Sequence, residues 1–224
     1  PKNKRTYDES WFAPRDPGLG TVLVMLGVEG EIPELAHHNF LFSDDWSDDF
    51  DAVFNGPVAS RPQAASQSIY VSKPSATDPS VAPAGHENLF VLVPVPADPS
   101  VGHGDMYRGE ASEQVQRIAD AAIEQIAARC GVAGLDRRIV VKQTLGPADF
   151  AERYNAWSGG SIGPAHTLRQ SAFLRGSNKS RKAGNVLYAG ATTTPGVGVP
   201  MCLISAENVL KRVRADRSSG PLQG

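Results

Sequence analysis

The stretch NVLYAGATTTPGVGVPMCLISA, residues 185–206, decides how the end of the chain can fold. Its apolar beginning predicts a strand over 185–190, and a turn with Gly196 and Gly198 follows. Pro200 suits the first turn of a helix, which we expect to end near residue 214. A lone strand–helix unit cannot bury a parallel strand without neighbouring strands. We therefore expect this unit to belong to a different, doubly wound sheet, whose neighbouring strands this chain does not supply.

The turn in this stretch has the composition of a place where a backbone approaches a ligand. Glycines leave space, and a helix N-terminus presents free N–H groups and a partial positive charge to a phosphate or an electron-rich ring oxygen. Residues 196–201 read GxGxxM, and no acidic residue follows about twenty positions on, so the dinucleotide fingerprint is absent. On the residues alone, a cofactor-contacting turn and an ordinary strand–turn–helix corner remain equally open.

The rest of the chain predicts an α+β fold, with a mixed or antiparallel sheet and flanking helices. We expect the run over 21–28 to be a strand buried on both faces, and the prolines that end the run over 88–96 to place its far end at a sheet edge or exit. The apolar stripe over 110–130 predicts a helix, as does the i, i+4, i+8 spacing of Trp46, Phe50 and Phe54. The other expected elements are strands over 35–42, 68–72 and 138–145 and a helix over 147–157.

Composition and charge narrow the class of protein. The 224 residues carry 22 basic and 24 acidic side chains, and the apolar runs are far shorter than the ~20 residues of a membrane span. Two cysteines favour a cytoplasmic location over a disulfide scaffold. Residues 175–217 carry 8 bases and 2 acids, which indicates either solvated surface or a basic face for a bilayer leaflet or a cofactor diphosphate. The overall balance disfavours nucleic acid as a partner.

The chain resembles the C-terminal portion of bacterial-type carotenoid desaturases, which act on phytoene or dehydrosqualene. The string GATTTPGVGVPM at 190–201 resembles the flavin-contacting motif of that family, and further blocks match in order and spacing over nearly the whole chain. These blocks are residues 37–39, 54–57, 75–85, 86–96, 147–150 and 165–173. The GxGxxG turn and acidic residue that hold the ADP half of FAD in this family are not in the sequence.

The resemblance implies an FAD-dependent oxidoreductase that desaturates a long isoprenoid polyene by hydride transfer to the flavin. It implies a linker or irregular segment at 1–20, part of the substrate-binding domain at 21–175, a return into a Rossmann-like FAD domain at 176–214 and a disordered tail at 215–224. With part of the flavin pocket missing, the chain alone is expected to hold no FAD and to be inactive. A substrate in the bilayer implies peripheral association with a membrane, and exposed apolar surface implies possible homo-oligomers.

The same resemblance assigns site residues. The cofactor-binding residues would be Gly190, Ala191, Gly198, Val199, Pro200 and Met201, although Ala191 stands where some related flavoenzymes carry an acid. His166 is a candidate general base, and no other catalytic residue is assigned. A tunnel for the polyene would be lined by apolar and aromatic side chains. The candidates are Phe40, Phe42, Tyr70, Phe90, Trp157 and Phe173, and the alternative for each is an ordinary place in the hydrophobic core.

Other readings of the chain remain open. The acidic run that includes Asp44, Asp45 and Asp48 lacks the glycine and distal glutamate of a calcium loop, so no metal site is predicted. The adjacent His37 and His38 would point to opposite faces of a strand and could not share one metal ion. The alternative functions are a non-catalytic module that binds a hydrophobic ligand or associates with itself, and a related flavin oxidoreductase that acts on an amine or a retinoid.

Overall fold

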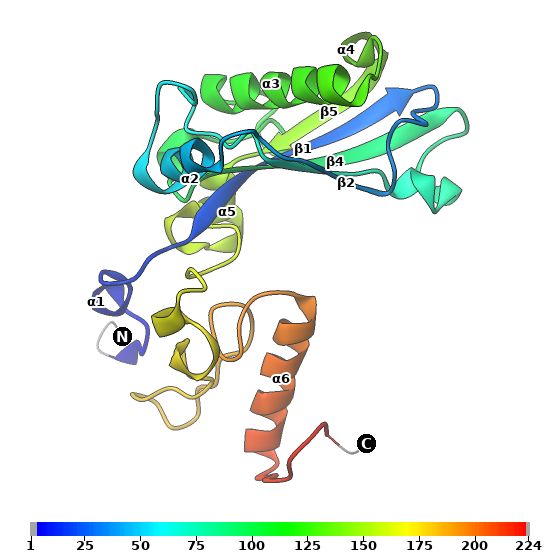
Figure 1. Cartoon of the computed structure of the whole chain (residues 1–224). Coiled ribbons are helices and arrows are strands. Elements are labelled where there is room, and N and C mark those ends of the chain that lie inside the picture. Colours follow the sequence, from blue (N-terminus) through cyan, green and yellow to red (C-terminus); the bar gives the residue numbers. More distant parts are fainter. Residues whose placement is uncertain (1–3, 223–224) are drawn as a thin grey trace. The chain divides into compact units, whose positions relative to one another are not determined.

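The fold is described from a computed structural model, in which residues 4–222 are described. The chain divides into two compact units. The sheet unit comprises residues 19–161, and the C-terminal unit comprises residues 1–18 together with 162–224. We expected residues 1–20 to form a linker or an irregular segment; residues 1–18 group with the end of the chain, and the sheet unit begins at Leu19. The boundary near 161 also lies before the expected one at 175. Figure 1 shows the elements of each unit.

The sheet unit is built on a five-stranded antiparallel sheet with the strand order β2-β3-β4-β1-β5. The predicted α+β class is confirmed. The strands are β1 (Leu19–Glu29), β2 (His38–Leu41), β3 (Ile69–Ser72), β4 (His86–Pro96) and β5 (Ile139–Leu145). Helices α2 (Trp46–Asn55), α3 (Glu113–Cys130), α4 (Leu135–Arg138) and α5 (Pro147–Tyr154) accompany them.

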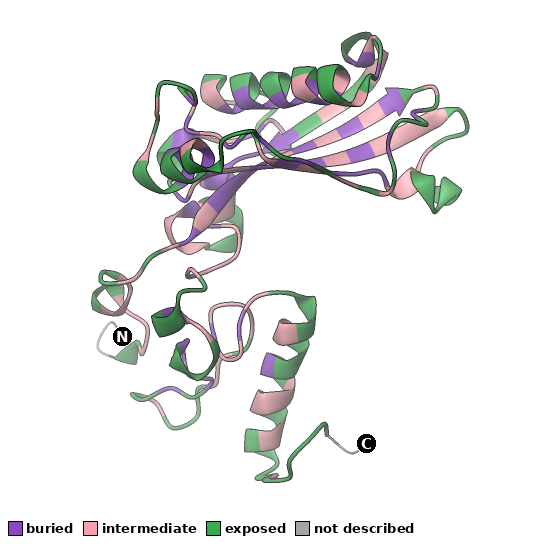
Figure 2. Ribbon diagram, viewed as in Figure 1, coloured by how far each residue is buried: buried purple, intermediate pink, exposed green. Residues whose placement is uncertain are grey.

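The hydrophobic core lies between one face of this sheet and α3. Alternate residues of β1 and β4 pair across the two strands, with Val24 opposite Val91 and Leu26 opposite Leu89. Both pairs are buried, and they pack in one cluster with the apolar stripe of α3, which includes Ile118 and Ile126. Figure 2 shows the buried positions where α3 faces the sheet. The 3.6-residue stripe therefore placed the core helix correctly.

The opposite face of the sheet is only partly covered. Leu23 and Met25 alternate with the buried residues of β1 and are half-buried, because α3 covers the other face. The expectation that β1 is buried on both faces was wrong. A fully buried parallel strand and a strand of a one-sided antiparallel sheet can have the same apolar composition, and only the neighbours decide between them.

Strand β4 is central in the sheet and lies between β3 and β1. Its prolines fit there because the pairing with β3 stops at Leu92, two residues before Pro94. Pro94 and Pro96 continue only along β1, opposite Thr21 and Leu19. Proline lacks the N–H that a second ladder would need. The prolines therefore mark where the chain leaves the β3 ladder, and the strand itself is not an edge strand.

The C-terminal unit contains α1 (Glu9–Phe12), short 3₁₀ turns and α6 (Val199–Val213). Helix α6 confirms the helix expected after Pro200. The strand expected over 185–190 does not form; within this segment, Leu187 makes an isolated bridge with Lys179. This segment has no sheet to join in the described part of its unit, and an extended apolar segment without a ladder partner is not a strand. The structure therefore contains no doubly wound sheet in residues 4–222.

Both ends of the chain are tied into the C-terminal unit. Tyr7 donates a hydrogen bond from its hydroxyl to the carbonyl of Ser177, and Lys182 pairs with Asp8 at 3.2 Å. In the expected disordered tail, Lys211 Nζ donates to the carbonyl of Ser218 at 3.1 Å. These contacts hold Tyr7, Asp8 and Ser218 against the rest of that unit.

Candidate functional site

Arg175 holds the start of the glycine-containing turn. Its side chain is 4% exposed and has no carboxylate partner among the described residues. The guanidinium donates instead to backbone carbonyls, at 2.6 Å to Ala191 and at 2.8 Å to Pro164. Burial lowers the pKa of Arg175 from its ordinary value. A buried planar cation with five donors thus orders several loops of the C-terminal unit at once.

A buried polar cluster joins the same turn to α6. The cluster consists of Asn178, Thr193 and Ser205. Ser205 Oγ lies 3.0 Å from Thr193 Oγ1, 3.0 Å from Asn178 Nδ2 and 3.1 Å from the backbone nitrogen of Gly190, which donates to it. Ser205 is the one buried residue of α6. Sequence reasoning missed all three residues, because a serine on a helix carries no pattern until its partners are known.

The beginning of α6 is open to a ligand. Gly198 occupies the N-cap position with a φ of +104°, and no side chain caps the helix. The first-turn N–H groups of Val199 and Met201 therefore have no side-chain acceptor, while Pro200 has no N–H. A Cβ placed on Gly190 would meet nothing within 4 Å, and one on Gly198 would meet only the Pro200 ring at 4.0 Å. The predicted cofactor residues thus lie around a turn with free backbone donors and open space.

His166, the candidate base, lies against this turn. Val197 N–H donates to His166 Nε2 at 3.4 Å. Partial burial and the nearby Arg175 lower the pKa of His166 from its ordinary value of 6.5. The imidazole is therefore neutral at pH 7 and acts as an acceptor toward Val197. The structure brings His166 together with the 196–201 part of the predicted site.

In the sheet unit, six aromatic side chains, all exposed except the half-buried Tyr70, form two neighbouring runs of ring contacts that we call the aromatic track. Its members are Tyr70, Phe40, Phe42, Trp46, Phe50 and Phe54. Ring centroids are 5.1 Å apart for Tyr70 and Phe40, 5.5 Å apart for Phe42 and Trp46, and 6.3 Å apart for Phe50 and Phe54. Phe40 is 63% exposed and Phe50 is 58% exposed. So much contiguous aromatic surface is typical of a binding surface.

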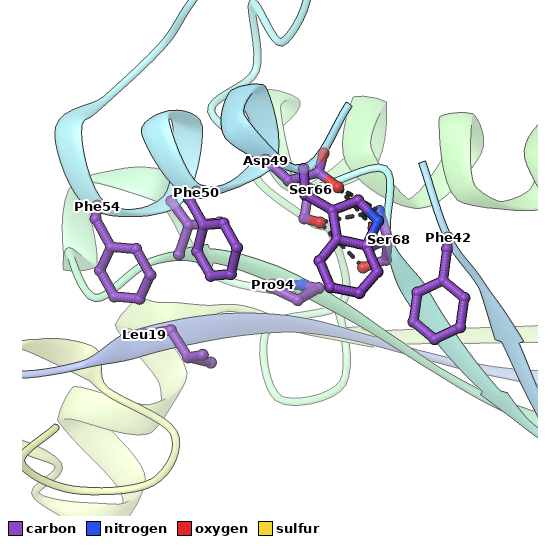
Figure 3. A pocket seen from close by; sticks show the side chains of 10 residues that line it. Leu19, Phe42, Asp49, Phe50, Phe54, Ser66, Ser68 and Pro94 are labelled. Carbon is purple, nitrogen blue, oxygen red and sulfur yellow. Dashed lines mark hydrogen bonds between the residues drawn. The ribbon is translucent and has the colours of Figure 1, made fainter. Parts of the chain in front are cut away.

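The track continues into a groove of about 230 Å³ between α2 and the strands β1 and β4. Figure 3 shows Phe50 and Phe54 extending from α2 toward Leu19 and Pro94, and Trp46 also lines the groove. Pro94 lies two residues beyond Leu92, so both face the same side of β4. The groove therefore opens on the side of the sheet that α3 leaves free. The surface that lines it is almost wholly hydrocarbon.

The polar atoms at the edge of the groove bind one another. Asp49 accepts from Arg61 Nε at 2.8 Å and from the hydroxyls of Ser43 and Ser68. Burial opposes ionisation of Asp49, but these bonds and the N–H of Gln67 hold the pKa of its carboxyl well below the ordinary range. A ligand in the groove would thus find no free carboxylate. This arrangement suits an uncharged, apolar molecule.

The expected tunnel residues divide between the two units. Phe40 and Phe42 are exposed in the aromatic track, and Tyr70 and Phe90 are half-buried on strands of the same sheet. Trp157 lies in a short 3₁₀ turn of the sheet unit, and Phe173 lies in the C-terminal unit. Sequence reasoning did not assign the aromatic residues of α2 to a binding surface. Their i, i+4, i+8 spacing showed that they share a face, and this face is exposed.

His37 and His38 do not alternate between the two faces of a strand. His38 opens β2, whereas His37 precedes it, and their ring centroids are 4.2 Å apart. The expectation that they point to opposite faces was wrong, because only one of them is in the strand. His37 Nδ1 lies 2.6 Å from Thr77 Oγ1, and His38 Nδ1 lies 2.7 Å from the Tyr70 hydroxyl.

Two classes of feature are absent from the part of the chain that the structure describes. Within residues 4–222, no group of three histidine, cysteine or acidic side chains is arranged to hold a metal ion. In the same range, no helix combines the length and apolarity needed to cross a membrane. Asp45 instead caps α2 by accepting from the N–H of Ser47 at 2.8 Å.

Comparison with known proteins gives relatives over almost the whole chain. No protein-family model matches it. The chain is 41% identical over 216 residues to a carotenoid 3,4-desaturase of Haloarcula japonica and 30% identical over 217 residues to a 4,4'-diapophytoene desaturase of Staphylococcus aureus. Each match covers 96% of this chain but only 41% and 42% of the relatives, so the chain spans about two fifths of their length. The chain belongs to the carotenoid desaturase family.

Proposed function

We propose that this chain is the C-terminal portion of an FAD-dependent carotenoid desaturase, in which it supplies the polyene-binding surface and one wall of the flavin site. The observation that carries the proposal is the aromatic track and its groove, because they offer a long apolar surface with no free charge. A polyene hydrocarbon has no polar handle and must be bound by burial of its surface, at about 25 cal/mol per Å². The names of the two relatives support the same class of substrate.

The turn at 190–201 fits the isoalloxazine side of FAD. Gly190 and Gly198 leave open space, and the uncapped N-terminus of α6 offers N–H donors. Gly190, Ala191, Gly198, Val199, Pro200 and Met201 would hold the ring and the adjoining ribityl chain. When bound, FAD supplies the acceptor for the hydride that leaves the polyene. The dipole of α6 would favour electron density on the ring edge by about 0.3–2 kcal/mol.

The residues around the turn would position it for the reaction. Arg175 fixes the Ala191 carbonyl, and the cluster of Asn178, Thr193 and Ser205 fixes the chain between Gly190 and α6. His166 would act as the base that accepts the proton, since its ring is neutral at pH 7 and lies beside the same turn. The aromatic track would exclude water from the polyene. The whole protein would associate peripherally with a membrane, in the cytoplasm.

A second candidate function is a module that binds a hydrophobic ligand without catalysis, or that associates with itself. The exposed aromatic track favours it, because this surface does not depend on the flavin turn. The two candidates differ in one respect. A desaturase needs both the track and the turn, whereas a binding module needs only the track.

A chimaera tests the proposal. The matching segment of the Haloarcula japonica relative is replaced by this chain, and bound flavin and polyene desaturation are measured by absorbance. We expect a yellow protein that lengthens the chromophore of its substrate. The variant Gly198→Val should lose flavin, because valine disfavours a φ of +104°. Gly184→Val is the matched control, since Gly184 is exposed and has open space around it at an ordinary φ.

The outcomes separate the two candidates. A chimaera that binds the polyene, but neither binds flavin nor desaturates the polyene, would favour the binding module. Equal flavin content in the Gly198 and Gly184 variants would contradict the assignment of the 190–201 turn.

A further inference from the structure

The far end of α6 carries a second hollow of different chemistry. It has a volume of about 560 Å³, and its lining includes Lys179, Arg212 and Arg217. Helix α6 has 15 residues, so its two ends are about 22 Å apart at 1.5 Å per residue. This hollow, which we call the basic hollow, is therefore separate from the flavin turn at the helix N-terminus.

Of the four cations that line the basic hollow, Lys211 donates to the carbonyls of Ser218 and Gly220, and the other three have no anionic partner among the described residues. Among the described residues, no hydrogen bond or ion pair involves the side chains of Lys179, Arg212 or Arg217. The only acid in the lining is Asp216. Asp216 already accepts from the backbone N–H of Ser218 at 2.8 Å, and its pKa is lowered mainly by hydrogen bonds from that residue. The hollow thus carries net positive charge.

The dipole of α6 accounts for only some of the positive charges in the basic hollow. Cations in the last turn of a helix stabilise its partial negative end, and Arg212 is in that turn. Lys179 comes from a distant loop, and Arg217 follows the helix, so neither position is required by the helix. Exposed Val213 and half-buried Leu187 line the same hollow. Such a mixture of cations and apolar surface matches a phosphate group that is attached to a hydrocarbon.

We propose that the basic hollow binds the phosphate headgroup of an anionic lipid and so attaches the protein to a bilayer. The proposal deepens the proposed function, since it assigns a surface to the expected membrane association. It is tested without flavin or polyene. Failure of either proposal therefore leaves the other unaffected.

The experiment is co-sedimentation of the chain with vesicles. One set consists of phosphatidylcholine alone, and the other contains phosphatidylglycerol as well. We expect salt-sensitive binding to the second set only, because basic residues near an anionic surface each contribute about fivefold to partitioning. The variant Lys179→Gln/Arg212→Gln/Arg217→Gln should bind roughly a hundredfold more weakly. Circular dichroism checks that it is folded.

Two further variants show whether the effect belongs to the hollow. The triple variant Lys4→Gln/Arg129→Gln/Arg137→Gln removes the same charge from exposed positions elsewhere and should bind normally. The charge-retaining variant Arg212→Lys/Arg217→Lys should also bind. Equal losses in the two triple variants would overturn the proposal, because net charge alone would then explain the binding. Equal binding to both vesicle sets would overturn it too.

A soluble anion is the remaining alternative source of the phosphate group. Inorganic phosphate and pyrophosphate are titrated into the chain while the backbone amides around Lys179 and Arg217 are followed by NMR. We expect that neither anion binds saturably at anion concentrations that do not displace the chain from the vesicles. Saturation by free pyrophosphate with displacement from vesicles would overturn the lipid assignment and make the hollow a site for a soluble diphosphate.

Discussion

The hydroxyl oxygen of Ser205 lies 3.0 Å from that of Thr193, and through this contact α6 is fastened to the turn that precedes it. Ser205 is fully buried and also accepts from the Gly190 N–H at 3.1 Å. The Ser205 side chain therefore contacts both the Gly190 backbone at the start of the turn and the Thr193 side chain further along it. The open backbone at Gly198 can keep its shape because the residues on either side of it are fixed.

Replacement of Ser205 by alanine should loosen the turn. Ser205→Ala removes the acceptor of the Gly190 N–H and leaves buried polar groups of Asn178 and Thr193 with one partner fewer. Such a loss costs about 1–3 kcal/mol. Native-state hydrogen exchange at the Gly190 amide should therefore quicken by roughly fivefold to 150-fold. The matched control is Ser219→Ala, because Ser219 is exposed. Unchanged exchange at Gly190 in the Ser205 variant would show that the cluster does not hold the turn.

The buried ion pair of the sheet unit is expected to be intolerant of losing one partner. Asp49→Asn leaves the Arg61 guanidinium buried without a counter-charge, and the breaking of a buried pair costs about 3–5 kcal/mol. Urea unfolding followed by tryptophan fluorescence measures the change. Asp44→Asn, at an exposed position on the same segment, should change the stability by less than about 0.5 kcal/mol. Similar values for the two variants would contradict the assigned role of the pair.

The loss of folding stability at low pH should depend on the Asp49 carboxyl. The folded-state pKa of Asp49 is lowered, as is that of Glu87, which is half-buried and accepts from Ser75, from the Ile32 N–H and from Lys73. A lowered pKa means that the unfolded chain takes up protons first. This stability is complete above a pH of about 4 and is lost as the pH falls toward the folded-state values. The variant Asp49→Asn should show a flatter decline over that range. An identical decline in wild type and variant would exclude Asp49 as a source.

Features that depend on the local sequence pattern could be predicted from the sequence, whereas features that depend on contacts with distant segments could not. The stripe that includes Ile118 and Ile126 predicted α3, because a helix with one apolar face has only one way to bury it. The run over 185–190 was wrongly expected to be a strand, because strand formation needs hydrogen-bond partners from elsewhere. Periodicity put Phe50 and Phe54 on one face of α2, but it could not tell that this face stays uncovered. The role of Ser205 depends wholly on contacts between distant segments.

His166 should titrate below its ordinary range and report on the turn. Partial burial and Arg175 lower its pKa, so the unfolded chain is protonated first, and stability is lost as the pH falls below about 6.5. Protonation also removes the acceptor of the Val197 N–H. The Val197 amide shift in NMR should therefore follow the His166 titration and lose its pH dependence in His166→Gln. His103→Gln is the control, since His103 lies in the sheet unit. A Val197 amide that titrates unchanged without His166 would refute the contact.

Removal of one ring from the aromatic track should weaken polyene binding without harming the fold. Phe50 is 58% exposed, so Phe50→Ser should alter the free energy of unfolding by less than about 0.5 kcal/mol. If a polyene covers the ring, the loss of about 1.5–3 kcal/mol of burial weakens its affinity by roughly tenfold to a hundredfold. Quenching of tryptophan fluorescence by a detergent-solubilised polyene measures the affinity, with Trp46 as a nearby reporter. Leu168→Ser removes a 90% exposed apolar side chain from the C-terminal unit and should leave the affinity unchanged. Equal affinities of the Phe50 and Leu168 variants would mean that the groove beside α2 is not where the polyene binds.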